Sequence, residues 1–592
     1  MNRDRHGGGG PADLTPLWVL IPVAALVAVL GLVWLGGTLG AWASGAGWDP
    51  PPFSPATLIW ALRGTDPWPG VATPWIAGGI IAVVLAAAAL ALAAAWTVPP
   101  LLPRRDGFAN RRQAKRLTVP AQTAKAQRLR PSLKDRRAKD IAPADAGFAL
   151  GTMDPEGVEL RGSWEDTALV IMGPRGGKTS AIGGPAALEA PGACLVTSNK
   201  ADIYTLTATK RAEKGRVWCF DPQNITHGHR DDEFYWDMIT EARTLEGAGR
   251  LAMNLSNNAS AGGKGGKGEW WGKAGQSVLR SLFHAAALDP GRGLEDAMRW
   301  VFDAADRTPV EILRAHEGLE VLADSLEGTI DGAFETREGI YEHARQAVAC
   351  LLDPDIRAWV TPGPYKDEFD PAEFVASTDA LYLLSKDGGG SAAGIITALT
   401  DACLRAGVAE AEACPGQRLD PPMVPVLDEA ANVCKIEDLP FLYSHFGSRG
   451  ITPITILQNY EQGTGVWGRG GMNTLFSAST VKVLGSGVDD DAYADRLSKL
   501  VGLHYVTETS VSRSSGSTST TRSRRRERIL DIADVREMKE GTAIVLATSM
   551  RPAKVRLNPW YRGPAAEDIA RGKDALDEAI VQSARASRRM LR

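Results

Sequence analysis

Cysteine is scarce in this chain of 592 residues, which contains six in total. No two of them form a C-x-x-C pair and none has the spacing of a zinc site, which argues against both a disulfide framework and a zinc ribbon. The six are Cys194, Cys219, Cys350, Cys403, Cys414 and Cys434. We therefore expect reduced thiols in a cytoplasmic body. The net charge of −4 is also small, but it says little because the basic residues are clustered.

Charge is absent from two long stretches, residues 14–48 and 67–103. Within them, 17–35 and 76–96 are long and apolar enough to cross a bilayer as helices. The tryptophans near their ends, where interfacial aromatics are expected, are Trp18, Trp34, Trp75 and Trp96. A cleavable signal peptide is the alternative for the first stretch, but its apolar core is longer than such peptides require. The sequence thus predicts a membrane anchor of two transmembrane helices.

The distribution of basic residues predicts the orientation of this anchor. Arg3 and Arg5 precede the first span, whereas the loop between the spans has only Arg63. Six more basic residues follow the second span: Arg104, Arg105, Arg111, Arg112, Lys115 and Arg116. Lys and Arg are retained on the cytoplasmic side of membranes. We therefore predict a two-pass plasma-membrane protein with both termini inside and residues 40–72 outside.

The segment 104–139 contains thirteen Lys or Arg and two acidic residues. We interpret it as part of a solvated linker beside the membrane, where it would be attracted to anionic lipid. A role in steering DNA is the alternative.

A phosphate-binding loop is predicted at residues 168–182. A short apolar run there precedes a glycine-rich turn and the start of a helix, so that backbone N–H groups can surround phosphate oxygens. The candidate nucleotide-binding residues are Gly173, Pro174, Arg175, Gly176, Gly177, Lys178, Thr179 and Ser180. In such loops the Lys contacts the β- and γ-phosphates and the Thr hydroxyl binds Mg²⁺.

The loop departs from the usual pattern, because Gly173 and Gly177 enclose three residues instead of four. Either the loop is one residue short, or Met172 takes the position of the first glycine.

A Walker B element is predicted at residues 423–429, an apolar strand that ends in Asp428 and Glu429. Asp428 would hold Mg²⁺ through water, and Glu429 would polarise the attacking water. Pro425 is unexpected in a central strand because it has no N–H for the ladder. A further strand, 454–458, ends in Gln458, which is the usual place for a residue that senses the γ-phosphate.

Strands that alternate with helices predict an α/β fold with a mostly parallel sheet, whose ligands bind at the carboxyl ends of the strands. The other predicted strands are 193–197, 217–220, 380–384 and 481–485, with a strand and hairpin at 147–160. Residues 238–374 have helical spacing and predict an all-α insertion. We interpret the Ser/Thr/Arg-rich segment 511–528 as a flexible surface loop, and the basic tail as a helix or a disordered end.

The order of three motifs, 428–433, 448–451 and 456–458, resembles the signature of the TraG/TraD-type coupling ATPases of conjugation and type IV secretion. The layout is also similar: two membrane spans, a RecA-like ATPase domain and an all-α insertion. The resemblance implies the domains 1–103 (anchor), 104–146 (basic linker), 147–237 with 375–562 (nucleotide-binding domain), 238–374 (all-α insertion) and 563–592 (basic tail).

What the resemblance implies for function is an ATP- and Mg²⁺-dependent motor, a homo-hexamer that brings DNA with a relaxase, or a protein, to a secretion channel. The implied roles are phosphate and Mg²⁺ binding for Lys178 and Thr179, metal binding for Asp428, water activation for Glu429 and γ-phosphate sensing for Gln458. Arg449 is a candidate finger for a neighbouring subunit's site, with a structural salt bridge as the alternative. Lys264 and Lys267 are candidates for a central channel.

Three other functions compete with this interpretation. An FtsK-like DNA translocase would share the ATPase core, but it is expected to have more spans and a C-terminal winged helix. A type VII-like secretion ATPase would have several P-loops. A catalytically weak scaffold that recruits substrates to a channel stays open because of the unusual P-loop.

Overall fold

The computed structural model describes residues 15–53, 67–97, 107–228, 234–259, 267–386, 392–488, 490–514 and 517–590. The chain divides into two compact units, Met1–Arg104 and Arg105–Arg592. Several residues that carried the predicted topology lie outside the described ranges: Arg3, Arg5, Arg63, Arg104 and Arg105.

The first unit is a pair of packed helices, α1 (Thr15–Ala43) and α3 (Thr73–Thr97). Their backbones approach closely at glycines, since a Cβ on Gly79 would lie 2.1 Å from the Gly36 carbonyl oxygen. No described stretch of helix has the length and apolar character that a bilayer crossing demands. Parts of both predicted spans lie outside the residues whose side chains are described.

The second unit is built on an 11-stranded sheet in the order β2-β1-β15-β14-β11-β3-β10-β9-β4-β8-β5. The strands from β11 to β5 run parallel, and those on the other side of β11 pair antiparallel. The strands are β1 (Gly147–Met153), β2 (Glu159–Ser163), β3 (Ala168–Ile171), β4 (Cys194–Ser198), β5 (Val217–Phe220), β8 (Ala380–Leu384), β9 (Val424–Leu427), β10 (Ile454–Leu457), β11 (Val481–Gly485), β14 (Thr542–Ala547) and β15 (Ala553–Arg556). The predicted α/β fold with a mostly parallel sheet is confirmed.

Apolar strands without polar alternation explain this sheet, because a strand with helices on both faces is buried on both faces. In β3, Leu169 and Ile171 enter one core, and Ala168 and Val170 enter the other. Helices α6 (Gly184–Glu189) and α7 (Asp202–Arg211) cover the second face. The first face packs against α16 (Ala393–Ala413), α17 (Ala430–Val433), α18 (Leu439–Phe446) and α19 (Tyr460–Ala478).

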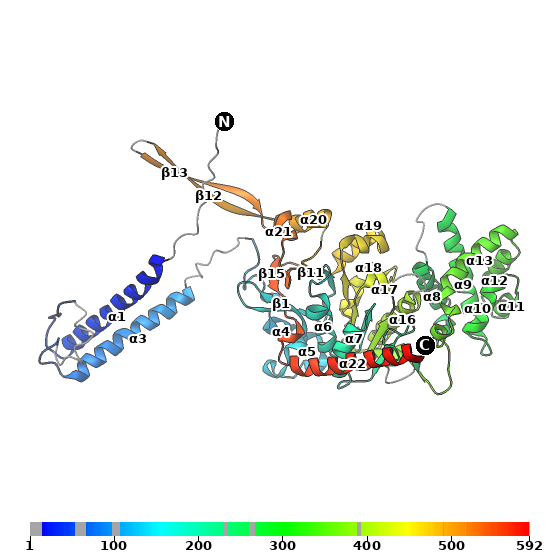
Figure 1. Cartoon of the computed structure of the whole chain (residues 1–592), viewed down its shortest axis with the longest axis horizontal. Coiled ribbons are helices and arrows are strands. Elements are labelled where there is room, and N and C mark those ends of the chain that lie inside the picture. Colours follow the sequence, from blue (N-terminus) through cyan, green and yellow to red (C-terminus); the bar gives the residue numbers. More distant parts are fainter. Residues whose placement is uncertain are drawn as a thin grey trace. The chain divides into compact units, whose positions relative to one another are not determined.

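Between β5 and β8 the chain forms a block of helices that continues the first core (Figure 1, green). The helices are α8 (Leu245–Ala259), α9 (Lys267–Leu288), α10 (Leu294–Phe302), α11 (Thr308–Arg314), α12 (Glu320–Ile330), α13 (Phe334–Val348) and α14 (Pro354–Arg357). A two-residue pair, β6 (Phe234–Tyr235) with β7 (Asp367–Glu368), and α15 (Pro371–Val375) lie at its edges. Lys264 lies outside the described residues.

Two segments differ from the sequence interpretation. The predicted flexible loop 511–528 is instead the outer part of a β-hairpin, β12 (Leu503–Ser514) with β13 (Ser517–Arg528). The backbones of Thr and Ser residues can form strand pairs just as those of apolar residues can. A strand of such residues has no alternation of apolar and polar positions, so it is not apparent in the sequence.

The predicted basic linker is folded from residue 107 onward, with α4 (Val119–Leu129) and α5 (Pro143–Ala146). Leu117 and Leu133 are buried in it, and the Arg130 guanidinium is paired with Asp420 at 3.0 Å. The basic tail forms α22 (Ala566–Met590), a helix that packs along α7. Its amphipathic pattern supplies the apolar side that contacts the body, for example through Leu576.

Candidate nucleotide site

Three neighbouring parallel strands, β3, β10 and β9, end at one edge of the sheet. The glycine-rich loop follows β3, Asp428 and Glu429 follow β9, and Gln458 follows β10. The predicted P-loop, Walker B and sensor residues therefore meet at the carboxyl edge, where parallel α/β sheets bind ligands.

The conformation of the loop requires its glycines at two points. Gly177 has φ of 95°, which other residues rarely adopt. A Cβ on Gly173 would lie 1.8 Å from the Gly487 carbonyl oxygen, in the loop after β11. Helical backbone begins directly at Lys178 and continues to Gly183. The first N–H groups of such a helix lack intrahelical acceptors and can serve phosphate oxygens.

Met172 stands where the P-loop pattern places its first glycine, with four residues between it and Gly177. Its side chain is fully buried, and its backbone N–H donates to the Leu457 carbonyl at 3.0 Å. The Met172 side chain lies over Gly176 and Gly485, where added Cβ atoms would approach its Cγ to 2.4 and 2.6 Å. These two glycines make room for the methionine, so the loop keeps its length without the first glycine.

Glu429 is the centre of the polar contacts at this edge. The Lys178 ammonium forms an ion pair and hydrogen bond with its carboxylate. The Gln458 side-chain amide donates to both carboxylate oxygens, at 2.8 and 2.9 Å, and the Asn432 amide donates at 3.4 Å. Glu429 has φ of 52°, an uncommon conformation for a residue other than glycine, and such strain clusters at functional sites.

Asp428 lies beside this network and is almost fully buried. The Thr179 hydroxyl donates to its carboxylate at 3.3 Å, and the Thr197 hydroxyl donates to its backbone carbonyl at 3.1 Å. The pKa of Asp428 is raised to about 6, mainly by burial and also by the nearby charges of Glu429 and Asp202, although the Lys178 charge lowers it. An ionised carboxylate here is therefore poorly compensated without an additional cation.

These oxygens fit the way Mg²⁺ binds in such sites. Mg²⁺ commonly uses one or two protein oxygens and takes its other ligands from substrate phosphates and water. Thr179 and Asp428 supply that pair, and the raised pKa of Asp428 fits a group that gains a cation partner. Among the described residues there is no group of three or more His, Cys, Asp or Glu that could form a protein-only metal cage.

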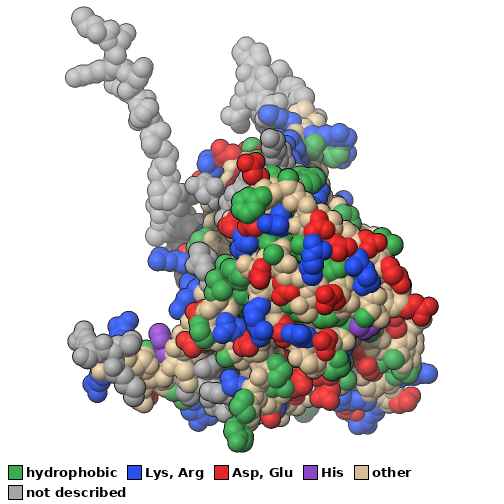
Figure 2. Space-filling model, turned by 90° about the vertical axis from the view of Figure 1, so that its right-hand side faces the viewer, with side chains coloured by type: hydrophobic (Ala, Val, Ile, Leu, Met, Phe, Trp, Pro, Cys, Tyr) green, Lys and Arg blue, Asp and Glu red, His purple; other side chains and the backbone are tan. Residues whose placement is uncertain are grey.

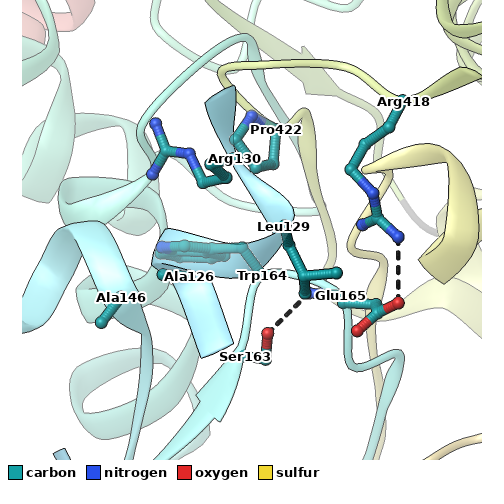
Figure 3. A pocket seen from close by; sticks show the side chains of 9 residues that line it. All are labelled: Ala126, Leu129, Arg130, Ala146, Ser163, Trp164, Glu165, Arg418 and Pro422. Carbon is teal, nitrogen blue, oxygen red and sulfur yellow. Dashed lines mark hydrogen bonds and ion pairs between the residues drawn. The ribbon is translucent and has the colours of Figure 1, made fainter. Parts of the chain in front are cut away.

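Arg449 does not join this cluster. It ends the short helical turn Gly447–Arg449 before β10 begins, so it lies at the opposite edge of the sheet. Its guanidinium pairs with Glu412 at 2.8 Å. The same edge has a small pocket lined by Trp164, Arg130 and Arg418, in which Arg418 bonds Glu165 at 2.9 Å (Figure 3).

Two further polar residues lie at the site but were not predicted from the sequence as site residues. Asn432 lies one helical turn after Glu429, and Asp202 begins α7 directly after β4. The order of the strands, which places β4 next to β9, brings Asp202 toward Asp428. Asp221, at the end of β5, has a structural role, because its carboxylate accepts from the N–H groups of Ile225 and Thr226 at 2.7 Å.

The mostly parallel sheet and the polar residues at its carboxyl edge together define an α/β P-loop ATPase fold. Residues 422–540 match the family model described as the TraM recognition site of TraD and TraG. This match includes the segment whose motifs suggested the resemblance to TraG/TraD-type coupling ATPases, and the predicted resemblance is confirmed.

Solved structures of the bacterial conjugative coupling protein TrwB have a similar fold. The unbound monoclinic form of TrwBΔN70 is 18% identical, with a TM-score of 0.51, over 75% of this chain and 94% of that chain. TrwB in complex with a non-hydrolysable ATP analogue is 19% identical, with a TM-score of 0.51, over 67% of this chain and 86% of that chain. No curated protein sequence matches the chain at a significant level.

Proposed function

We propose that this chain is a membrane-anchored coupling protein that hydrolyses ATP with Mg²⁺ and delivers DNA or nucleoprotein to a type IV secretion channel. The observation that carries this proposal is the convergence of Lys178, Thr179, Asp428, Glu429 and Gln458 at one sheet edge, in a chain whose residues 422–540 match TraD and TraG.

Nucleotide binding would begin by separating an ion pair. The Lys178 ammonium now neutralises Glu429, and the phosphates of ATP offer it a stronger and more negative partner. When Lys178 moves to the phosphates, Glu429 keeps its hydrogen bonds from Gln458 and Asn432, which hold the carboxylate in place. The freed carboxylate is then able to accept a hydrogen bond from a water molecule.

Asp428 and Thr179 would hold Mg²⁺, which neutralises charge on the phosphates. Glu429 would orient the attacking water and accept its proton as the bond from the water oxygen to the γ-phosphorus forms and the bond from the γ-phosphorus to the bridging oxygen of ADP breaks. Gln458 would couple hydrolysis at Glu429 to helix α19. Its side chain contacts Glu429, and its backbone begins the segment that leads into α19.

The remaining parts of the proposal concern the location of the motor, its partner protein and its oligomeric state. The uncharged stretches 14–48 and 67–103 would anchor it in the plasma membrane with both termini in the cytoplasm. The match at 422–540 favours a TraM-like partner that marks the DNA–relaxase complex. A homo-hexamer would allow Arg449 of one subunit to complete the site of its neighbour.

Mg²⁺-dependent ATPase activity of the purified full chain in detergent tests this proposal. Activity per subunit should rise with protein concentration, because assembly completes the sites, and it should rise again with added DNA. Nucleotide binding without turnover at any concentration, with or without DNA, would instead favour the recruiting scaffold.

A further inference from the structure

The last strand of the sheet, β15, ends at the edge that holds the glycine-rich loop. It pairs antiparallel with β14, which pairs antiparallel with β11, so β15 runs in the same direction as β11 and β3. The register across these four strands sets Lys554 of β15 level with Ile171, the last residue of β3. The chain therefore leaves β15 at the height where the loop leaves β3.

The residues directly after β15 pack against the loop. Leu557 is buried in the second core, and a Cβ on Gly177 would lie 3.7 Å from its Cδ1. The Leu557 backbone N–H donates to the Gly541 carbonyl at 2.8 Å. The Thr152 hydroxyl donates to the side-chain oxygen of Asn558 at 3.0 Å. These contacts fix the start of the segment relative to the glycine-rich loop.

A short helical turn, Trp560–Arg562, comes next and lies beside Lys178–Gly183, the first helical residues after the loop. The turn is closed by a hydrogen bond from the Gly563 N–H to the Trp560 carbonyl at 3.0 Å. The chain then enters α22, which packs along α7 (Figure 1). The turn is thus held at both ends, by the sheet on one side and by α22 on the other.

The turn presents two adjacent aromatic side chains. The rings of Trp560 and Tyr561 meet edge to face, with centroids 5.7 Å apart and an angle of 81° between their planes. Trp560 is half-buried, whereas Tyr561 is 55% exposed. Exposed apolar side chains are scattered among acidic and basic ones on the side seen in Figure 2, and such single residues need no explanation. Trp560 and Tyr561 differ because they are adjacent, fixed in place and next to a phosphate-binding loop.

The site determines which way a nucleotide lies along the sheet edge. The γ-phosphate belongs near Glu429 and Gln458, which follow β9 and β10. The loop and the helix start after it hold the α- and β-phosphates. In the strand order, β10 and β9 lie on one side of β3, and β11, β14 and β15 lie on the other. The ribose and base extend from the α-phosphate, so they are directed away from β10, toward the Trp560–Arg562 turn.

We propose that Tyr561 stacks on the purine base of the bound nucleotide and that the edge-to-face contact with Trp560 holds the Tyr561 ring in place. This inference rests on the proposed ATPase function and adds the recognition of the base to it. Stacking on an aromatic ring tolerates every base, because every base has a π-face, and a purine offers a larger face than a pyrimidine. The ligand class is therefore a purine nucleoside triphosphate.

The test is the affinity of the full chain in detergent for Mg²⁺-ATP, Mg²⁺-CTP and Mg²⁺-tripolyphosphate, measured by isothermal titration calorimetry. CTP has a smaller base than ATP, and tripolyphosphate has the phosphates without a base. Tyr561→Ala removes the aromatic ring, and Tyr561→Phe keeps it. Tyr365→Ala is the matched control, because Tyr365 is a fully exposed tyrosine in the loop before β7.

Tyr561→Ala should bind Mg²⁺-ATP about tenfold more weakly than the parent protein, since stacking of one base on an aromatic ring contributes about this much. Its affinity for tripolyphosphate should be unchanged, and its preference for ATP over CTP should be smaller. Tyr561→Phe and Tyr365→Ala should bind all three ligands as the parent does. In turnover, Tyr561→Ala should raise KM and keep kcat, because the ring does not contact the reacting phosphate.

Equal affinity of Tyr561→Ala and the parent protein for Mg²⁺-ATP would overturn the proposal. An equal loss of affinity for ATP and for tripolyphosphate would also overturn it, since the turn would then support the loop without binding the base. The proposed ATPase function is judged separately, because the affinities do not depend on turnover. A parent protein that binds Mg²⁺-ATP through Lys178 and Tyr561 without hydrolysing it would contradict the motor function and support base stacking.

Discussion

The ammonium group of Lys178 and the carboxylate of Glu429 are paired with each other, although ATP hydrolysis requires them to act on different atoms. The pair neutralises two charges that are largely buried, and a buried charge without a partner is strongly destabilising. ATP therefore has to replace one partner with its own phosphates. This competition links nucleotide binding to the release of the water-activating group.

Asp428 should make the nucleotide-free protein less stable as the pH rises. Its pKa is raised to about 6, whereas an unfolded Asp titrates near 4, so the folded state binds more protons between these values. Stability is then lost as the pH increases through this window, by up to about 3 kcal/mol. Asp428→Asn should accordingly have a higher Tm than the parent protein at pH 8, and the difference should shrink toward pH 4.

The measurement is thermal unfolding without Mg²⁺ or nucleotide. Thr197→Val provides a control that alters a neighbour of Asp428 without removing the carboxylate. A Tm of Asp428→Asn at or below that of the parent at pH 8 would show that burial does not disfavour the charged form.

Met172 should be coupled energetically to Gly485. Met172→Gly restores the usual P-loop residue but leaves a cavity, so we expect a loss of about 2–4 kcal/mol in stability. Gly485→Ala places a methyl group against the methionine side chain and should also destabilise. In the double variant the alanine fills part of the cavity, so its loss should be smaller than the sum of the single losses.

Denaturant unfolding of the four proteins gives this coupling energy directly. Simple additivity would mean that Met172 and Gly485 do not compensate for each other. Loss of ATP binding in Met172→Gly, despite correct folding, would show that the methionine has a role in the site itself.

Arg449 should affect turnover if it acts on a neighbouring subunit. Arg449→Ala is expected to lower kcat by about a thousandfold without weakening nucleotide binding. Glu412→Gln, which removes only the observed ion-pair partner, should keep most of the activity. Mixing Arg449→Ala with Lys178→Ala protein should restore part of the activity, because some interfaces then combine an intact loop with an intact arginine.

If Glu412→Gln is as inactive as Arg449→Ala and co-assembled mixtures show no recovery, Arg449 is a structural residue.

The membrane topology is tested with reporter fusions. A reporter after residue 110 should be cytoplasmic, and one near residue 55 should be external, because basic residues flank the outer ends of the two uncharged stretches. A reporter that is external at residue 110 would reverse the topology and separate the ATPase from cytoplasmic ATP.

The sheet could be predicted from sequence because its strands are short, continuous apolar runs. The predicted strand at 217–220 coincides with β5, and that at 454–458 is β10 with Gln458 after it. Pro425 is tolerated in the central strand β9 because the N–H of Val424 donates to Ala193 on the β4 side, so the nitrogen of Pro425 faces β10, whose register with β9 begins only at Val426.

Features that depend on strand order or on polar residues could not be predicted in the same way. Asp202 approaches Asp428 because β4 and β9 are neighbours, which no local pattern encodes. Residues 512–523 of the β12–β13 hairpin are all Ser, Thr, Arg or Gly, so this part of the sequence has no apolar period. In residues 107–146 charged residues dominate the sequence. The apolar side chains that pack against the rest of the body, such as the buried Leu117, therefore gave no clear pattern.

The proposed role of Glu429 is to activate water at a working ATPase site. Its most direct test is single-turnover hydrolysis of ATP by Glu429→Gln, with nucleotide affinity measured on the same protein and Lys178→Ala as the reference for lost binding. We expect Glu429→Gln to bind Mg²⁺-ATP at least as tightly as the parent, since Lys178 is freed from its ion pair, and to hydrolyse it at least a hundredfold more slowly. Hydrolysis by Glu429→Gln at the rate of the parent protein would show that Glu429 does not activate the water.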